Sequence, residues 1–130
     1  MIAVVDDDEA FREALTGLLK SLGYVAIAFD SADAFLNSDR RPETTCLISD
    51  VHMPGMTGPE LHSKLVASGA PIPTILITAY PDPTERARAL QNGVVCYLTK
   101  PFREDDLLAG INRAADAPVS IPREGAGDDV

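Results

Sequence analysis

The amino-acid sequence predicts an α/β protein with a single doubly wound (βα)5 fold around a parallel five-stranded sheet. Apolar, strand-like runs alternate five times with segments of helical periodicity. Because these runs are rich in Val, Ile and Leu and do not alternate strictly with polar residues, they are typical of strands buried on both faces of a parallel sheet. With 130 residues, 45% of them hydrophobic, the chain corresponds to about one domain with a sizeable core.

The first half of the chain opens on an apolar run and continues with a helix. Apolar residues recur every three or four positions from Phe11 to Leu22, which predicts one continuous helical face. Gly23 follows at the C′ position, where helices commonly end. Ser31 is expected to cap a short helix that carries Phe35. The expected strands cover residues 2–5, 24–29, 44–49, 73–78 and 94–98.

The second half contributes three further helices. Gly58 lies in the turn that leads into the first of them, which is expected to end at Gly69. Asp82 or Thr84 caps a weakly apolar helix, and residues 103–115 form the last one. Right-handed crossovers place helices on both faces of the sheet, for which we expect the strand order 2-1-3-4-5.

Charge and composition exclude several kinds of partner. The 11 basic and 20 acidic residues give a formal net charge of −9, which repels nucleic acid and anionic membranes. No apolar run reaches the ~18–20 residues of a membrane span, and we expect no secretory signal. Cys46 and Cys96 are interpreted as buried free thiols of a reducing compartment. These features together favour a cytoplasmic protein.

Carboxylates gather where the strands end. Asp6 and Asp7 follow the first strand, Asp50 the third, Thr78 ends the fourth and Lys100 follows the fifth. Ligands of open α/β sheets bind at these carboxyl ends, so the three aspartates are expected to share one cleft. Converging carboxylates repel one another, and hard oxygen ligands favour Mg²⁺, which also binds phosphate oxygens. With a lysine and a hydroxyl nearby, an aspartate nucleophile makes a phosphoryl-acceptor site.

Four short motifs contain these residues: VVDDDE near the start, ISDVHMPGMTG in the middle, then ITAY and YLTKPF. Together they resemble the response-regulator receiver domain of two-component signalling, over residues 1–116. SADAFL and KPFREDDLL are similar to its FixJ-like subfamily. The resemblance implies a flavodoxin-like fold. Residues 117–130 are rich in Pro, Gly and acidic residues and are expected to form a flexible tail or truncated linker.

The resemblance implies a magnesium-dependent phospho-acceptor site. Asp50 matches the phosphorylated aspartate, Asp7 the direct Mg²⁺ ligand, and Asp6 the aspartate that binds the ion mostly through water. The backbone carbonyl of His52 matches the third protein ligand. The side chains of His52 and His62 are expected to be exposed to solvent and to bind no metal.

The same resemblance implies a set of residues that change position when the acceptor is phosphorylated. Thr78 matches the hydroxyl that moves onto the phosphoryl group, and Lys100 the lysine that pairs with it. Tyr97 matches the aromatic switch residue, although a tyrosine on a strand can also simply pack in the core. The Lys100–Pro101 bond is expected to be cis. The implied donor is a sensor histidine kinase or a phosphotransfer protein, and the chain is expected to be a signalling acceptor and not an enzyme in the ordinary sense.

Phosphorylation is expected to turn the ring of Tyr97 from the surface to the interior. This movement would reshape the face formed by the fourth helix, the fifth strand and the fifth helix. Arg86 and Arg88 on that face could pair with the acidic residues 104–106 in a weak, salt-sensitive homodimer. Those acids could equally be ordinary charge at a helix N-terminus. Asp8 is expected to be an N-cap or a solvated acid of the first turn.

Three other functions are weighed against the receiver interpretation. A Mg²⁺-dependent aspartyl phosphohydrolase of the haloacid-dehalogenase type has its nucleophile on the first strand, whereas Asp50 follows the third. A phosphorylation-independent interaction module needs none of the strand-end carboxylates, nor Thr78 or Lys100. A flavodoxin-like cofactor carrier needs a phosphate-binding loop after the first strand, where this chain has three aspartates.

Overall fold

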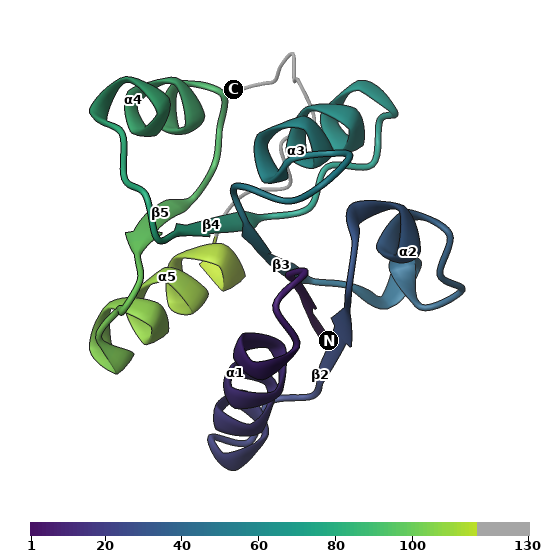
Figure 1. The fold of residues 1–130 in the computed structure, drawn as a ribbon. Helices are drawn as coiled ribbons and strands as arrows, with labels where there is room; N and C mark the ends of the chain where they lie inside the picture. Colours follow the sequence, from purple (N-terminus) through teal and green to yellow (C-terminus); the bar gives the residue numbers. More distant parts are fainter. Residues whose placement is uncertain (117–130) are drawn as a thin grey trace.

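The computed structural model describes residues 1–116 and has the doubly wound (βα)5 fold that the sequence predicts (Figure 1). Within these residues one sheet has the strand order β2-β1-β3-β4-β5, and each neighbouring pair is parallel. The strands are β1 (Ile2–Val5), β2 (Ala26–Phe29), β3 (Cys46–Asp50), β4 (Thr74–Thr78) and β5 (Cys96–Thr99). The helices are α1 (Glu9–Ser21), α2 (Ala32–Leu36), the 3₁₀ turn η1 (Arg41–Glu43), α3 (Gly58–Ala67), α4 (Pro83–Gln91) and α5 (Glu104–Asp116). The tail predicted for residues 117–130 lies outside the described residues.

The strands β2, β3 and β5 begin later than the sequence predicts, because each apolar run extends past its regularly paired part. Just before β3, the N–H of Thr45 donates to the carbonyl oxygen of Met1 at 2.9 Å. Just before β5, the N–H of Val95 donates to the carbonyl oxygen of Thr74 at 2.8 Å. These two hydrogen bonds continue the pairing of neighbouring strands beyond their regular ladder.

Helices cover both faces of the sheet, with α1 and α5 on one side and α2, α3 and α4 on the other (Figure 1). Under α1 and α5, Leu19 and Leu107 belong to the same buried apolar cluster as Ile75. On the opposite face, Phe35 and Leu65 form a second cluster with residues of β1 and β3. None of the helices within residues 1–116 is long and apolar enough to cross a membrane.

Local sequence signals fix the helix ends. The side chain of Asp8 accepts hydrogen bonds from two N–H groups in the first turn of α1, so Asp8 is its N-cap, one of the two predicted roles. Ser31 caps α2 as predicted, and Asp82, not Thr84, caps α4. Gly23 follows α1 with φ of 94°, a conformation that glycine adopts without a steric penalty.

The prediction that His62 is exposed is wrong. His62 is 6% exposed and shares the buried stripe of α3 with Gly58, Leu61 and Leu65. The spacing of these four residues is that of one helical face, which the polar character of histidine concealed. Burial lowers the pKa of His62, so burial favours the neutral imidazole.

Both cysteines are buried and free, as predicted. Their strands are separated by β4, which keeps the two thiols from pairing. Burial raises the pKa of Cys46 to about 12, so this thiol stays protonated and unreactive.

Candidate functional site

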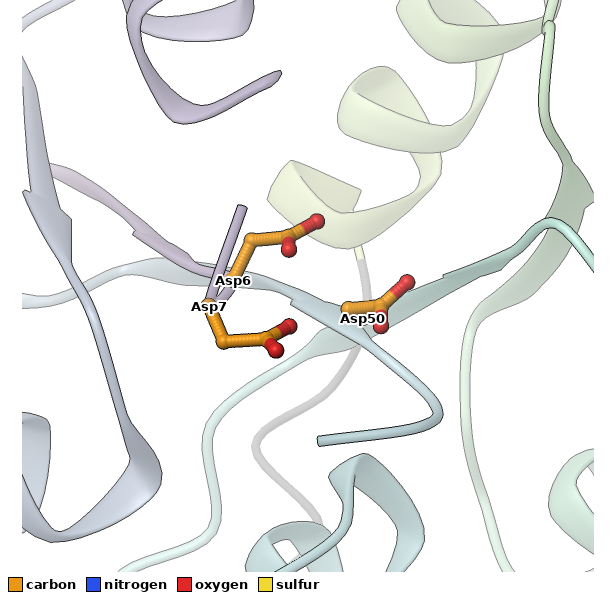
Figure 2. A group of neighbouring side chains, drawn as sticks. All are labelled: Asp6, Asp7 and Asp50. Atoms are coloured by element: carbon orange, nitrogen blue, oxygen red, sulfur yellow. The ribbon is translucent and has the colours of Figure 1, made fainter. Parts of the chain in front are cut away.

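Three carboxylates meet where β1 and β3 end, as the sequence predicts. Asp6 follows β1 directly, Asp50 is the last residue of the neighbouring strand β3, and Asp7 lies beside Asp6 (Figure 2). Each offers one oxygen atom, and these three atoms lie within 4.8 Å of one another. Asp6 is buried, Asp50 is 9% exposed and Asp7 is exposed, so the group reaches solvent on the Asp7 side. This acidic cluster could bind a divalent metal ion.

The ammonium group of Lys100 reaches the acidic cluster from the end of β5. Its Nζ lies 2.9 Å from Oδ2 of Asp6 and 3.0 Å from Oδ1 of Asp50. The same atom lies 4.0 Å from the centroid of the Phe11 ring. Burial acts to lower the pKa of Lys100, but its hydrogen bonds to the two carboxylates outweigh burial and the pKa rises. The following Lys100–Pro101 bond is cis, as predicted.

Asp50 lies in an electrostatic environment that disfavours its charge. Burial raises the pKa of Asp50, the hydrogen bond from Lys100 opposes that shift, and the negative charges of Asp6 and Asp7 raise the pKa further. One ammonium group therefore faces three carboxylates, and the cluster keeps an excess of negative charge. A set of oxygen donors with excess negative charge fits Mg²⁺, which the sequence predicts as the cofactor.

Contacts with the main chain fix the positions of Asp6 and Asp50. Oδ1 of Asp6 accepts the N–H of Asp8 at 2.9 Å, and Arg12 donates to the carbonyl oxygen of Asp6 at 2.8 Å. On the other side, α3 begins so close to the end of β3 that a Cβ at Gly58 would collide with the carbonyl oxygen of Asp50. The sequence identified Gly58 only as a turn residue, because close packing between a helix and a strand end leaves no local pattern.

Thr78 ends β4, the strand next to β3, and is fully buried. Its hydroxyl accepts the N–H of Tyr80 at 2.9 Å, and its carbonyl oxygen accepts the N–H of Lys100 at 2.7 Å. Thr78 thus lies at the same sheet edge as the acidic cluster, and its hydroxyl is hydrogen-bonded to the loop that follows β4. Its role toward a phosphoryl group stays a prediction.

His52 and Tyr80 follow Asp50 and Thr78 by two residues, in the loops that leave β3 and β4. Both side chains are exposed, as expected for His52, and Tyr80 is 75% exposed. The two rings meet edge to face with centroids 6.1 Å apart. The role of the His52 carbonyl oxygen as a metal ligand stays a prediction.

The ring of Tyr97 lies inside the protein, and its expected movement on phosphorylation stays a prediction. Tyr97 is 8% exposed and packs with Val51 and Leu76. Its hydroxyl donates to Oε1 of Glu85 at 2.7 Å and accepts the N–H of Asp82 at 3.3 Å. Sequence reasoning missed Glu85, because an acid in the first turn of a helix is ordinarily solvated charge.

These features define a class of protein: an open α/β domain with an acidic, lysine-paired cleft at the carboxyl ends of its parallel strands. The family model of the response regulator receiver domain matches residues 2–112. The chain belongs to this family of two-component signalling domains, which confirms the resemblance seen in the motifs.

Individual relatives agree with this assignment. The chain is 43% identical over 114 residues to the response regulator protein TmoT of Ectopseudomonas mendocina, covering 88% of this chain and 52% of that protein. It is 40% identical over 113 residues to the transcriptional regulatory protein FixJ of Bradyrhizobium diazoefficiens, covering 87% of this chain and 55% of that protein. The chain thus spans about half the length of the curated relatives it matches.

Solved structures show the same fold. The crystal structure of FixJ-N superposes with a TM-score of 0.80 at 32% identity, covering 92% of this chain and 96% of that one. The structure of the response regulator StyR superposes with a TM-score of 0.80 at 43% identity, covering 88% of this chain and 58% of that one.

Proposed function

We propose that Asp50 accepts a phosphoryl group from the phosphohistidine of a sensor histidine kinase or a phosphotransfer protein in the cytoplasm. The observation that carries the proposal is the position of Lys100, whose Nζ contacts both Asp6 and Asp50 within the acidic cluster. A nearly buried carboxylate beside a fixed cation and two further carboxylates suits phosphoryl transfer, where positioning and charge neutralisation supply most of the catalysis.

In the proposed reaction a carboxylate oxygen of Asp50 bonds to phosphorus while the phosphorus–nitrogen bond of the donor breaks. The donor imidazole leaves with the electron pair and takes up a proton. Lys100 already contacts Oδ1 of Asp50, so its ammonium group can pair with the new phosphoryl oxygens. The Thr78 hydroxyl, once released from the N–H of Tyr80, can donate to the same group.

The residues that would hold Mg²⁺ are Asp6, Asp7, Asp50 and the backbone carbonyl of His52. The oxygen atoms of the three carboxylates are close enough to share one ion, and the exposed Asp7 leaves room for water on that side. Bound there, Mg²⁺ would supply neutralisation of the charge on the transferring phosphoryl group. The chemistry expected of the chain is limited to its own phosphorylation and dephosphorylation.

The proposed output is a change at the face formed by α4, β5 and α5. Thr78 and Tyr97, the two proposed switch residues, lie on the strands β4 and β5 beside this face. Arg86 and Asp106 line one groove along β5, an arrangement that supports a weak phosphorylation-dependent homodimer. Because relatives such as FixJ are named transcriptional regulatory proteins and are about twice as long, we propose that the receiver controls a separate effector segment.

Labelling with acetyl phosphate and Mg²⁺, read by intact-mass spectrometry, tests the acceptor. The wild-type protein should gain one acid-labile phosphoryl group, and Asp50→Asn should gain none. Asp7→Asn should lose Mg²⁺-dependent labelling more completely than Asp6→Asn. Asp8→Asn is the matched control, since it removes a neighbouring acid and keeps an N-cap. Unchanged labelling of Asp50→Asn would refute the assignment.

A further inference from the structure

The first turn of α1 contacts both members of the ion pair between Asp6 and Lys100. Arg12 donates to the carbonyl oxygen of Asp6 at 2.8 Å. The ring of its neighbour Phe11 lies under the ammonium group of Lys100, with Nζ 4.0 Å from the ring centroid. This helix therefore contacts the lysine as well as the acidic cluster.

The surroundings of the Lys100 ammonium group leave it little access to water. Its Nζ lies 2.9 Å from Oδ2 of Asp6 and 3.0 Å from Oδ1 of Asp50, and the Lys100 side chain is 19% exposed. Two carboxylates and one aromatic face thus replace most of the water around this charge. A cation over an aromatic ring is attracted by the negative face of the ring, and the attraction is stronger where water is excluded.

Phe11 is itself held by aromatic packing. Its ring meets Phe102 edge to face, with centroids 6.2 Å apart and an interplanar angle of 85°. Both rings are half-buried and pack against the apolar cluster under α1 and α5. Phe102 follows Lys100 by two residues, so the ring of Phe11 is fixed relative to the segment that carries the lysine.

The contact with Lys100 distinguishes Phe11 from the other aromatic residues. Within residues 1–116, Phe11 is the only ring with a lysine or arginine over its face. Phe29 is also half-buried and also meets a second ring, that of Phe35, edge to face at 5.4 Å, but no cation lies over it. Packing alone requires only an apolar side chain of about the right size. The aromatic face of Phe11 therefore adds something to packing only at Lys100.

We propose that Phe11 is a positioning residue, whose aromatic face holds the ammonium group of Lys100 against Asp50 by electrostatic attraction. The contact itself stands on the geometry, and its effect on the reaction rests on the proposed function. A lysine already held at Asp50 can neutralise an incoming phosphoryl group without first being reoriented. Loss of the aromatic face should therefore slow the labelling of Asp50.

Fluorinated phenylalanines at position 11 of the full chain test the electrostatic attraction while nearly preserving the shape of the ring. Each added fluorine withdraws electron density from the face of the ring, so the attraction for the ammonium group weakens in steps. At saturating Mg²⁺, the rate of acetyl phosphate labelling should fall along the series from phenylalanine to pentafluorophenylalanine, by about fivefold in total. An unchanged rate along the series would overturn the proposal.

The same series at Phe29 is the matched control for the size and hydrophobicity of the fluorinated rings. It should leave the labelling rate unchanged, because no cation lies over Phe29. An equal decline in both series would assign the effect to packing and contradict the proposal. Phe11→Leu, which has no aromatic face, should label more slowly than Phe11→Tyr, which keeps one. Equal rates in these two variants would also count against the role of the ring.

A double-mutant cycle measures the contact without any phosphoryl transfer. Phe11→Leu should lower the urea midpoint more in the wild type than in a Lys100→Met background, where there is no ammonium group for the ring to attract. The cycle is measured without Mg²⁺, so it reports the Phe11–Lys100 contact alone. An equal shift in both backgrounds would show that Phe11 only packs in the core and would contradict the proposal.

Labelling of the wild type keeps the two proposals separate. If the wild type is not labelled at Asp50, the proposed function fails, and the double-mutant cycle still decides whether Phe11 holds Lys100. If the wild type is labelled and the rate does not change along the fluorinated series at Phe11, only the role of Phe11 fails.

Discussion

Two buried regions of this domain differ in the sign of what burial contributes to its stability. Under α1 and α5, Leu19, Leu107 and Ile75 are wholly buried. Where β1 and β3 end, Asp6 and Asp50 are nearly as buried but carry charge. A large apolar side chain stabilises a fold by roughly 1.5–3 kcal/mol when buried, whereas a buried carboxylate costs free energy unless it is fully paired. The apolar layer maintains the fold, and the acidic end depends on that stability.

The largest effect is expected in the apolar layer. Leu107→Ala should lower the free energy of unfolding by about 2–5 kcal/mol, because it leaves a cavity under α5. Val25→Ala is the control, since Val25 is 64% exposed and its truncation should change stability by less than about 0.5 kcal/mol. Urea unfolding measures the free energy of unfolding of both variants. Equal losses in the two variants would contradict the division between core and surface.

The apolar layer and the acidic cluster were both predictable from the sequence, for different reasons. The layer follows from the periodicity of residues such as Leu15 and Leu19, which repeats on every turn of α1. The cluster follows from topology, because parallel neighbours bring Asp6 and Asp50 to the same edge once the strand order is known. Lys100 joins them because it directly follows the last strand of the same sheet.

Contacts that depend on side-chain conformation were not predictable. Glu85 and Tyr97 are 12 residues apart on different elements, and no periodic pattern links them. His62 was misassigned because its polar character outweighed its place in the buried stripe of α3. The close approach of Gly58 to Asp50 is a property of how α3 docks on β3 and leaves no trace in the local sequence.

Two glycines give the second comparison. Gly58→Ala should lower the free energy of unfolding by about 1–3 kcal/mol and also reduce labelling of Asp50, because the added Cβ pushes on the carbonyl oxygen of Asp50. Gly17→Ala, in the open middle of α1, should instead stabilise the protein by about 0.5–1 kcal/mol. Thermal unfolding measures the stability of both variants, and acetyl phosphate labelling measures their effect on Asp50. A Gly58→Ala variant that folds and labels like the wild type would refute the close packing.

Asp50→Asn should raise the melting temperature by a few degrees at neutral pH. The folded-state pKa of Asp50 is raised above its unfolded value, so its contribution to stability is present at low pH and is lost as the pH rises through both values. Asparagine is uncharged, so it removes the free-energy cost of the buried negative charge, and its Oδ1 can still accept a hydrogen bond from Lys100. Asp8→Asn, which keeps its N-cap, should change the melting temperature less. A lower melting temperature for Asp50→Asn would show that the Lys100 pair stabilises the fold.

The smallest effect is expected at His62. Its folded-state pKa is lowered by burial, so its contribution to stability is complete above the unfolded value, about 6.5. That contribution is lost as the pH falls through 6.5 toward the folded-state value. His62→Gln should therefore flatten the dependence of the urea midpoint on pH below 6.5, with His52→Gln as the control for removing one imidazole. An unchanged pH dependence in His62→Gln would contradict the buried, neutral imidazole.

Borohydride trapping of the phosphorylated protein tests most directly the central claim, that the buried carboxylate at the acidic end is a phosphoryl acceptor. Borohydride reduces an acyl phosphate to an alcohol, so peptide mapping identifies which aspartate carried the phosphoryl group. After treatment with acetyl phosphate and Mg²⁺, the peptide that contains Asp50 should be reduced, and the peptide that contains Asp6 and Asp7 should not. Reduction at Asp6 or Asp7, or no reduction in a sample that has gained phosphoryl mass, would contradict the claim.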